Sequence, residues 1–211
     1  MTRLLIVDDH PIVRHGLRDL LQTQPDFEIA GEAEDTRTLV EMLRREPVDV
    51  VLLDISMPGR SGLDILKDIK SEFPSMAVLM ISVHPEEQFA MWALKGGASG
   101  YIHKGVAPDE LIAAVRKVAR GGRYISASFA ERLALDVQAG GKARQPHEYL
   151  SSREFTVLCM LASGKTVKEC AAELSLSVKT VSTYRTRLLV KLNLKANSDL
   201  TRYALQHELL K

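Results

Sequence analysis

Apolar and polar residues alternate along residues 1–120 with two different periods. Short runs rich in branched apolar residues predict β-strands, and the segments between them repeat apolar residues every three or four positions, which predicts helices. Strands that alternate with helices of this length are typical of βαβ units and a parallel sheet. The predicted strands cover about 3–8, 27–33, 48–54, 76–82 and 99–103, and the predicted helices cover about 11–24, 36–46, 62–73, 86–96 and 108–120.

Two of the predicted strands are apolar without interruption, at 50–53 and 76–81. A strand of this kind is buried on both faces, because helices cover both sides of the sheet. We therefore expect an α/β fold of the flavodoxin-like type, with five parallel strands in a doubly wound sheet. In that fold the strand order is 2-1-3-4-5.

The chain after residue 122 shows no strand pattern. A helix is predicted over about 126–138, and the Gly-, Pro- and charge-rich segment 139–148 predicts a flexible linker. Every later segment has helical spacing, so the chain is predicted to be α/β first and then all-α. The later helices cover about 152–163, 167–174, 178–193 and 197–210, and the expected domains are 1–122, a connecting helix and linker at 123–148, and 149–211.

Composition favours a soluble protein, and the net charge differs between its N-terminal and C-terminal parts. The 211 residues are 45% hydrophobic and 26% charged, and apolar runs such as 76–81 are far too short to cross a membrane. The N-terminus, MTRLLIVDDH, lacks a signal peptide, so we expect a cytoplasmic protein with no membrane partner. Net charge is −5 over 1–120 and +4 over 147–211, which predicts different partners for the two domains. Cys159 and Cys170 lack metal-ligand spacing and are predicted to be reduced and inert.

Acidic residues occur where two of the predicted strands end. Asp8 and Asp9 end the first strand, and Asp54 ends the third. These strands are neighbours in the expected order, and ligands bind outside the carboxyl ends of such strands. Three crowded carboxylates repel one another, and a hard cation relieves the repulsion. Carboxylates, a backbone carbonyl and water are the ligands that Mg²⁺ prefers, so the sequence predicts a Mg²⁺ site.

The remaining strand ends add a hydroxyl and an ammonium group. An acidic pair alone is equally typical of a solvated strand end, but Ser82 ends the fourth strand and Lys104 follows the fifth. A metal, an anion and a nucleophile would all find partners at this edge, as phosphoryl transfer requires. Asp54 is the candidate nucleophile, and its attack on phosphorus would form an acyl phosphate.

The segment 178–193 is an amphipathic helix with a polar, cationic outer face. Steps of about 100° per residue place Val181, Leu188 and Leu192 on one stripe. A short helix at 167–174 and a tight turn precede it, which is the helix-turn-helix layout, although a generic three-helix bundle shows the same stripes. Hydroxyl and basic side chains suit the phosphates and base edges of DNA. The outer face carries Lys179, Ser182, Thr183, Thr186, Arg187 and Val190.

The first 120 residues resemble the receiver domains of bacterial response regulators, which have a CheY-like fold. The resemblance rests on Asp8-Asp9, on DISMP at 54–58, on Ser82 and on GASGYIHK at 97–104, all in the family's order and spacing. It implies that phosphorylation controls the protein.

The resemblance also implies a role for individual residues. Asp54 would be phosphorylated, and Ser82 and Lys104 would contact the phosphoryl oxygens. Tyr101 would be the aromatic switch that turns inward when Ser82 moves, although a strand aromatic with one buried face is an alternative. Gly105 follows the lysine instead of proline, which excludes a cis X-Pro bond there. The implied Mg²⁺ ligands are Asp8, Asp9, Asp54 and the backbone carbonyl of Ser56.

Residues 150–200 resemble the four-helix LuxR-type DNA-binding domain, and the whole chain resembles the NarL/FixJ subfamily of response regulators. The matching pattern includes Arg153, Gly164 and Leu174. Tyr184 stands where the family frequently has His, which leaves the base preference open. The resemblance implies base contacts from Ser182, Thr183 and Thr186, and phosphate contacts from Lys179, Thr180, Arg185, Arg187 and Lys191.

These resemblances imply a transcriptional regulator and not an enzyme. A sensor histidine kinase would phosphorylate Asp54, and the phosphorylated protein would bind double-stranded promoter DNA as a homodimer. Phosphatases with an aspartate nucleophile place a second Asp two residues later, where this chain has Ser56. A nucleotide-binding domain is disfavoured because DDHP, after the first strand, is not a glycine-rich loop. A third hypothesis is a regulator that binds DNA independently of phosphorylation. The presence of Asp8, Asp9, Asp54 and Lys104 argues against it.

Overall fold

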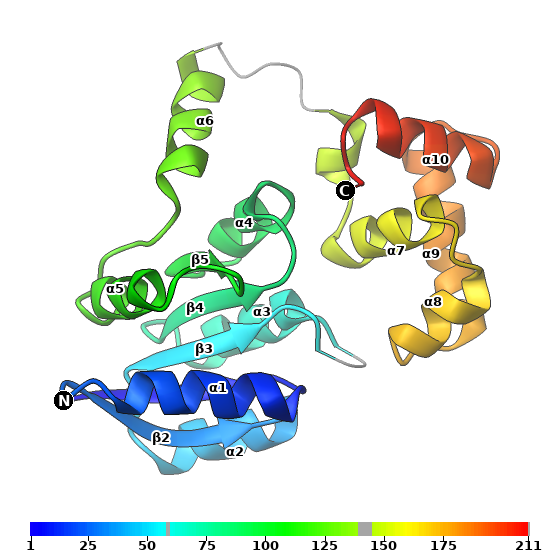
Figure 1. The fold of residues 1–211 in the computed structure, drawn as a ribbon. Helices are drawn as coiled ribbons and strands as arrows, with labels where there is room; N and C mark the ends of the chain where they lie inside the picture. The colour runs from blue at the N-terminus through cyan, green and yellow to red at the C-terminus, as the bar shows by residue number, and fades with distance from the viewer. Residues whose placement is uncertain (58–59, 139–144, 211) are drawn as a thin grey trace. The chain divides into compact units, whose positions relative to one another are not determined.

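Five parallel strands form the sheet of the N-terminal part of the chain, in the predicted order β2-β1-β3-β4-β5 (Figure 1). The computed structural model describes residues 1–57, 60–138 and 145–210. The chain divides into two units, residues 1–133 and 134–211. The strands are β1 (Thr2–Val7), β2 (Phe27–Ala33), β3 (Val50–Asp54), β4 (Ala77–Ser82) and β5 (Gly100–His103), and the helices are α1 (Pro11–Gln22), α2 (Thr36–Arg45), α3 (Gly62–Glu72), α4 (Glu86–Lys95), α5 (Pro108–Ala119) and α6 (Ala127–Gln138).

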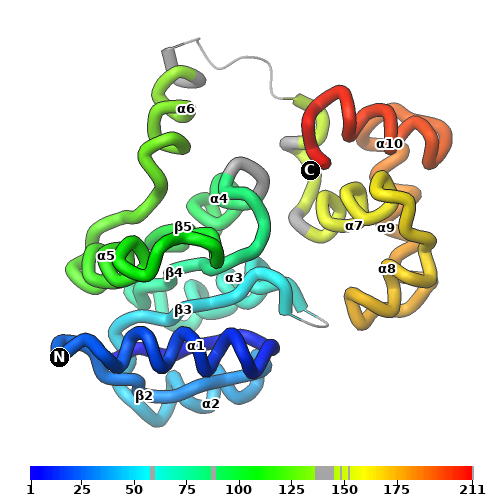
Figure 2. Tube along the Cα trace, viewed as in Figure 1, coloured from blue at the N-terminus to red at the C-terminus, as the bar shows by residue number. Residues whose placement is uncertain are grey.

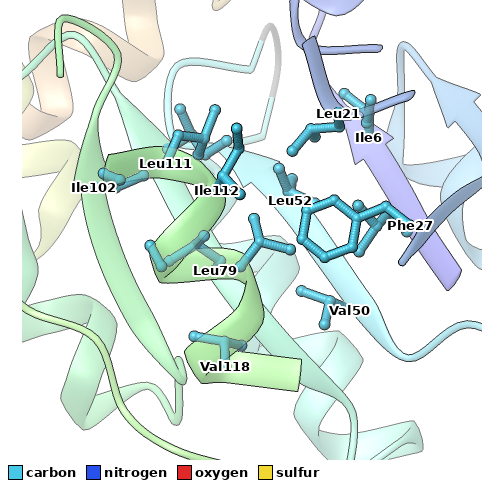
Figure 3. Packing of buried hydrophobic residues seen from close by; sticks show 14 residues of the cluster. Ile6, Leu21, Phe27, Val50, Leu52, Leu79, Ile102, Leu111, Ile112 and Val118 are labelled. Atoms are coloured by element: carbon cyan, nitrogen blue, oxygen red, sulfur yellow. The ribbon is translucent and has the colours of Figure 1, made fainter. Parts of the chain in front are cut away.

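Helices cover both faces of this sheet. On one face, Leu52 and Leu79 of the central strands meet Leu21 of α1 and Leu111 of α5 (Figure 3). Helices α2, α3 and α4 contact the strands from the other face (Figure 1). The central strands β3 and β4 are therefore enclosed, as their apolar runs predicted, and polar residues at their ends mark where this interior meets solvent.

Residues 145–210 of the second unit, which the structure describes, contain a short 3₁₀-helix, η1 (Pro146–Tyr149), and four α-helices (Figure 2). α7 packs against α9 and α10, and α8 packs against α9. Ser151 and Thr166 form capping boxes that start α7 and α8. None of the helices among the described residues is long and apolar enough to span a membrane. The helices are α7 (Ser152–Ala162), α8 (Val167–Glu173), α9 (Val178–Lys191) and α10 (Asn197–Gln206).

The predicted ends of the elements are correct to within two residues, except at α10. This helix ends at Gln206 and not near residue 210, as its spacing predicted. Glu208 has a left-handed backbone (φ 52°), which stops the helix, and Leu209 turns back into a buried position. The burial of the Leu209 side chain is thus favoured over continuation of the helix that the spacing predicted.

Two predicted loops are described only in part. The helix η1 forms at the end of the segment predicted as a linker, where Pro146 suits a first helical position. The rest of that segment, 139–144, lies outside the described residues, as do Pro58 and Gly59 of the DISMP loop.

The two cysteines both lie in the second unit. Cys170 is buried, Cys159 is half-buried, and neither forms a disulfide. Burial raises the pKa of both thiols, to about 12 for Cys159. Both thiols therefore stay protonated near neutral pH, which agrees with the predicted inert character.

His147 joins η1 to α10 through a small aromatic cluster. Its Nδ1 lies 3.0 Å from the Tyr203 hydroxyl, and its ring packs 5.2 Å from that of His207. Burial, with a smaller contribution from His207, lowers the pKa of His147 to about 4.

We expect His147 to remain neutral in the folded protein down to about pH 4. The unfolded chain binds that proton near pH 6.5, so the second unit loses stability, on the order of 1–2 kcal/mol, as the pH falls from 6.5 toward 4. Imidazole NMR titration of the wild type and His147→Asn checks this prediction. A His147 resonance that titrates at the ordinary pKa would contradict it.

Candidate acidic site and nucleic-acid interface

Three strands bring their C-terminal ends together to form an acidic site. Asp8 follows β1 directly and Asp54 is the last residue of β3, and these strands pair side by side. Both carboxylates are 1% exposed. Lys104, just after β5, places its Nζ 2.6 Å from Asp8 Oδ2 and 3.0 Å from Asp54 Oδ2. The predicted cluster of acids and one ammonium is therefore assembled in space.

Burial and crowding make the environment of the site unfavourable for its charges. Burial raises the pKa of Asp54, and the nearby Asp8 raises it further, although Lys104 opposes both effects. Burial also disfavours the charge on Lys104, but the attraction of Asp54 and Asp8 raises the pKa of that ammonium. The ammonium therefore stays charged, whereas Asp54 is a carboxylate held in an unfavourable environment.

Several oxygen atoms of the site are buried without a hydrogen bond. Among the described residues, Asp54 Oδ1 and Oδ2 and Asp9 Oδ1 have no hydrogen-bond partner of good geometry. The ion pair with Lys104 offsets the charge of Asp54 without satisfying its lone pairs. Ligand atoms of Asp8, Asp9, Asp54 and also His10 lie within 4.8 Å of one another. Unsatisfied, crowded carboxylate oxygens are the donor set that a hard divalent cation accepts.

A second group of polar contacts lies at the ends of β4 and β5. Ser82 is buried, and its Oγ accepts a hydrogen bond from the backbone N–H of His84 (3.0 Å). Tyr101 is fully buried, and its hydroxyl donates to the His84 carbonyl (2.7 Å). The Ser56 Oγ lies 3.2 Å from His84 Nε2. His84 thus contacts Ser82, Tyr101 and Ser56, and it connects these predicted residues to one another.

Sequence reasoning missed both histidines of this region. His10 and His84 carry no signal of their own in the sequence, because each is a single histidine in a loop. Their positions supply the only usable clue. His10 directly follows Asp8-Asp9, and His84 lies two residues after Ser82. Residues beside a strand end share the edge at which that strand opens to solvent.

Helix α9 has the predicted inner and outer faces. Val181, Leu188 and Leu192 are buried. The Ser177 side chain caps the helix by accepting from the Thr180 backbone N–H. The outer face is exposed and consists of Lys179, Ser182, Thr183, Thr186, Arg187 and Val190.

Three of the predicted DNA contacts have partners inside their own domain. Thr180 is half-buried, and its hydroxyl meets the Ser177 hydroxyl. Arg185 donates from Nε to Asn197 Oδ1 (2.6 Å). The Lys191 ammonium lies 2.7 Å from a carboxylate oxygen of Glu154, which is itself buried. These contacts give all three residues a packing role. On the exposed outer face, the hydroxyls of Thr183 and Thr186 donate only to carbonyls of α9 itself, those of Lys179 (3.0 Å) and Ser182 (3.1 Å).

Comparison with known proteins identifies the family. The family model described as the response regulator receiver domain matches residues 4–116, and that of the bacterial regulatory proteins, luxR family, matches residues 148–204. The response regulator UvrY of Escherichia coli is 38% identical over 209 residues, which cover 99% of this chain and 96% of UvrY. The oxygen regulatory protein NreC of Staphylococcus carnosus is 36% identical, over 99% of both chains.

A solved structure covers the same span. RcsB from Salmonella enterica serovar Typhimurium, bound to promoter rprA in the presence of the phosphomimetic BeF3-, has a TM-score of 0.66 and 29% identity over 96% of this chain and 97% of RcsB. The receiver-domain match includes the acidic site, and the luxR-family match includes α9. The chain therefore belongs to the NarL/FixJ-type response regulators, which join a receiver domain to a LuxR-type DNA-binding domain.

Proposed function

We propose that phosphorylation of Asp54 by a sensor histidine kinase switches the binding of this regulator to promoter DNA. The observation that carries the proposal is the Asp54 carboxylate, which is buried at a strand end, unsatisfied by hydrogen bonds and 3.0 Å from the Lys104 ammonium. The receiver domain is assigned to 1–122, the connection to 123–148 and the DNA-binding domain to 149–211. The protein acts in the cytoplasm, where promoter DNA is accessible.

The chemistry of the switch is a transfer of one phosphoryl group. An Asp54 carboxylate oxygen attacks the phosphorus of a phosphohistidine, a P–O bond forms and the P–N bond breaks. The electron pair of the P–N bond goes to the departing imidazole nitrogen, which takes a proton from water. The Lys104 ammonium balances the negative charge of the phosphoryl oxygens, and the Ser82 hydroxyl offers them a hydrogen bond. The acyl phosphate carries more negative charge than the Asp54 carboxylate that it replaces, so the cations of the site must balance the added charge.

A Mg²⁺ ion fits the donor set of the site. The unsatisfied oxygens of Asp9 and Asp54, together with Asp8 and the Ser56 backbone carbonyl, would hold it. When bound, Mg²⁺ supplies positive charge that neutralises the phosphoryl oxygens. Removal of the ion with a chelator would then leave Lys104 as the cation that pairs with Asp54 among the described residues.

The contacts of His84 provide a route from the site to the α4–β5–α5 surface. A phosphoryl group that recruits the Ser82 hydroxyl would compete with the His84 N–H, which now donates to that oxygen. Tyr101, the expected aromatic switch, is already buried and donates to the His84 carbonyl, so phosphorylation would favour this inward position. The outcome would be pairing of two chains into a homodimer. RcsB is described as dimers on DNA, which supports the same assembly here.

The phosphoacceptor can be tested directly by trapping the acyl phosphate. The full chain is incubated with Mg²⁺ and a small phosphodonor, reduced with borohydride, and mapped by mass spectrometry. Reduction at Asp54 alone is the expected result, and reduction at another residue would refute the assignment. Steady-state release of phosphate from phosphomonoesters would favour the alternative, an aspartate-nucleophile phosphatase.

We infer that the outer face of α9 enters the major groove of promoter DNA. The exposed hydroxyls of Ser182, Thr183 and Thr186 would meet base edges, and Lys179 and Arg187 would meet phosphates. Thr180, Arg185 and Lys191 would add phosphate contacts only where their internal partners allow it.

Arg187→Ala is expected to weaken DNA binding several-fold and equally for all sequences. One lost phosphate contact lowers the slope of log affinity against log salt by about 1. Fluorescence anisotropy at several salt concentrations measures this slope. The matched control is Arg37→Ala, which removes an equally exposed cation from α2 of the receiver and should leave the slope unchanged. An unaltered slope in Arg187→Ala would rule out its phosphate contact.

A further inference from the structure

His10 lies between the acidic pair Asp8-Asp9 and the start of helix α1. It occupies the residue position that caps α1, but its side chain makes no capping hydrogen bond. The ring instead turns back toward the acids. Its Nδ1 lies 3.0 Å from Asp9 Oδ1 and 3.3 Å from Asp8 Oδ1. The contacts of this nitrogen are therefore with the two acids and not with the helix.

The spacing of the four side chains suits one shared cation. The ligand atoms of Asp8, Asp9, His10 and Asp54 all lie within 4.8 Å of one another. Opposite ligands of a divalent ion with bonds of about 2.1 Å lie about 4.2 Å apart, so only small movements would bring the atoms onto one ion. The oxygens of Asp54 are buried and have no hydrogen-bond partner of good geometry, although Lys104 Nζ lies 3.0 Å from Oδ2. They give an independent sign that a cation binds at the same point.

An imidazole nitrogen changes which metals such a site prefers. Carboxylates and carbonyls alone suit Mg²⁺, which binds oxygen and keeps several waters. Imidazole suits borderline divalent ions such as Zn²⁺, Co²⁺ and Ni²⁺. We propose that His10 Nδ1 is a further protein ligand, which raises the affinity of this site for borderline divalent transition-metal ions and leaves its affinity for Mg²⁺ nearly unchanged. The inference rests on the proposed function only in sharing Asp8, Asp9 and Asp54.

A purely electrostatic role for His10 predicts the opposite result. An imidazolium paired with Asp8 and Asp9 would repel every cation, so removal of the ring would strengthen the binding of all divalent ions alike. A ligand role predicts a selective loss. The two roles therefore differ in sign for Co²⁺ and in selectivity between Co²⁺ and Mg²⁺.

The test is metal binding to the full chain, with Co²⁺ as the spectroscopic probe. Titrations followed by visible absorption and calorimetry compare the wild type with His10→Ala, and His15→Ala serves as the control because it removes an exposed histidine from the same helix. We expect His10→Ala to weaken Co²⁺ at least about tenfold and to change Mg²⁺ by less than about threefold. The Co²⁺-shifted imidazole proton in the NMR spectrum should vanish in His10→Ala and persist in His15→Ala.

Equal Co²⁺ affinity in the wild type and His10→Ala would overturn the proposal, as would tighter binding of both ions after the substitution. A Co²⁺ spectrum that survives Asp9→Ala would also overturn it, because the metal would then sit elsewhere. Binding of Co²⁺ through His10 in a wild type that fails to bind Mg²⁺ would support the inference and refute the Mg²⁺ part of the proposed function.

Discussion

Asp54→Asn abolishes the donor-driven gain in DNA affinity if Asp54 is the phosphoacceptor. Phosphorylation is expected to raise the affinity of the wild type for its promoter about tenfold, within the usual range for coupling between two sites. The amide of Asn keeps the shape of the side chain but cannot attack phosphorus, so the gain should disappear completely. Anisotropy with labelled promoter DNA, with and without a small phosphodonor and Mg²⁺, measures it.

The control for this experiment is Asp19→Asn, which removes a carboxylate from the exposed side of α1. It should retain the full gain. The same Asp54→Asn protein should also be more stable than the wild type near neutral pH. The raised pKa of Asp54 means that the folded protein disfavours its charge, which Asn removes. An equal donor-driven gain in DNA affinity in Asp54→Asn and Asp19→Asn would remove Asp54 from the mechanism.

Gly62→Ala is expected to be the most damaging small substitution in the receiver. Gly62 starts α3, and its backbone N–H donates to the Ile55 carbonyl (2.9 Å). A Cβ at this position would overlap the carbonyl oxygen of Asp54 and lie 2.9 Å from its carbonyl carbon. Backbone must move to accept it, so we expect a loss of about 2–4 kcal/mol in the free energy of unfolding and slower phosphorylation of Asp54.

Gly16→Ala is the matched control, because it adds the same methyl group to another helix. A Cβ on Gly16 would have no atom within 4 Å. Alanine in the middle of α1 should therefore stabilise the protein by about 0.5–1 kcal/mol. Urea unfolding of both variants, followed by the fluorescence of Trp92, compares them. Equal stability of the two variants would show that the α3 start can relax around a side chain.

The sheet and the acidic site were predictable because local patterns determine both. Unbroken apolar runs identified β3 and β4 as enclosed strands, and the parallel arrangement then placed Asp8, Asp54 and Ser82 at one edge. No knowledge of side-chain contacts was needed, since the order of strands alone brings their C-terminal ends together.

Contacts between distant side chains were not predictable in the same way. The helical wheel placed Arg185 on the inner side of α9 but did not reveal Asn197 as its partner. Lys191 satisfied the family pattern for a phosphate contact, yet Glu154 holds it within the domain. The early end of α10 has the same origin. Each depends on tertiary packing, which overrides propensity and spacing.

The ion pair between Lys104 and Asp8 joins residues that are 96 positions apart in the chain. Lys104 follows β5, the last strand of the sheet to leave the ribosome. Contacts of such long sequence separation form late, after most of the chain is already ordered. A receiver whose chain stops before Lys104 would therefore have the crowded carboxylates without their ammonium. The complete acidic site forms only when the last strand, β5, has joined the sheet.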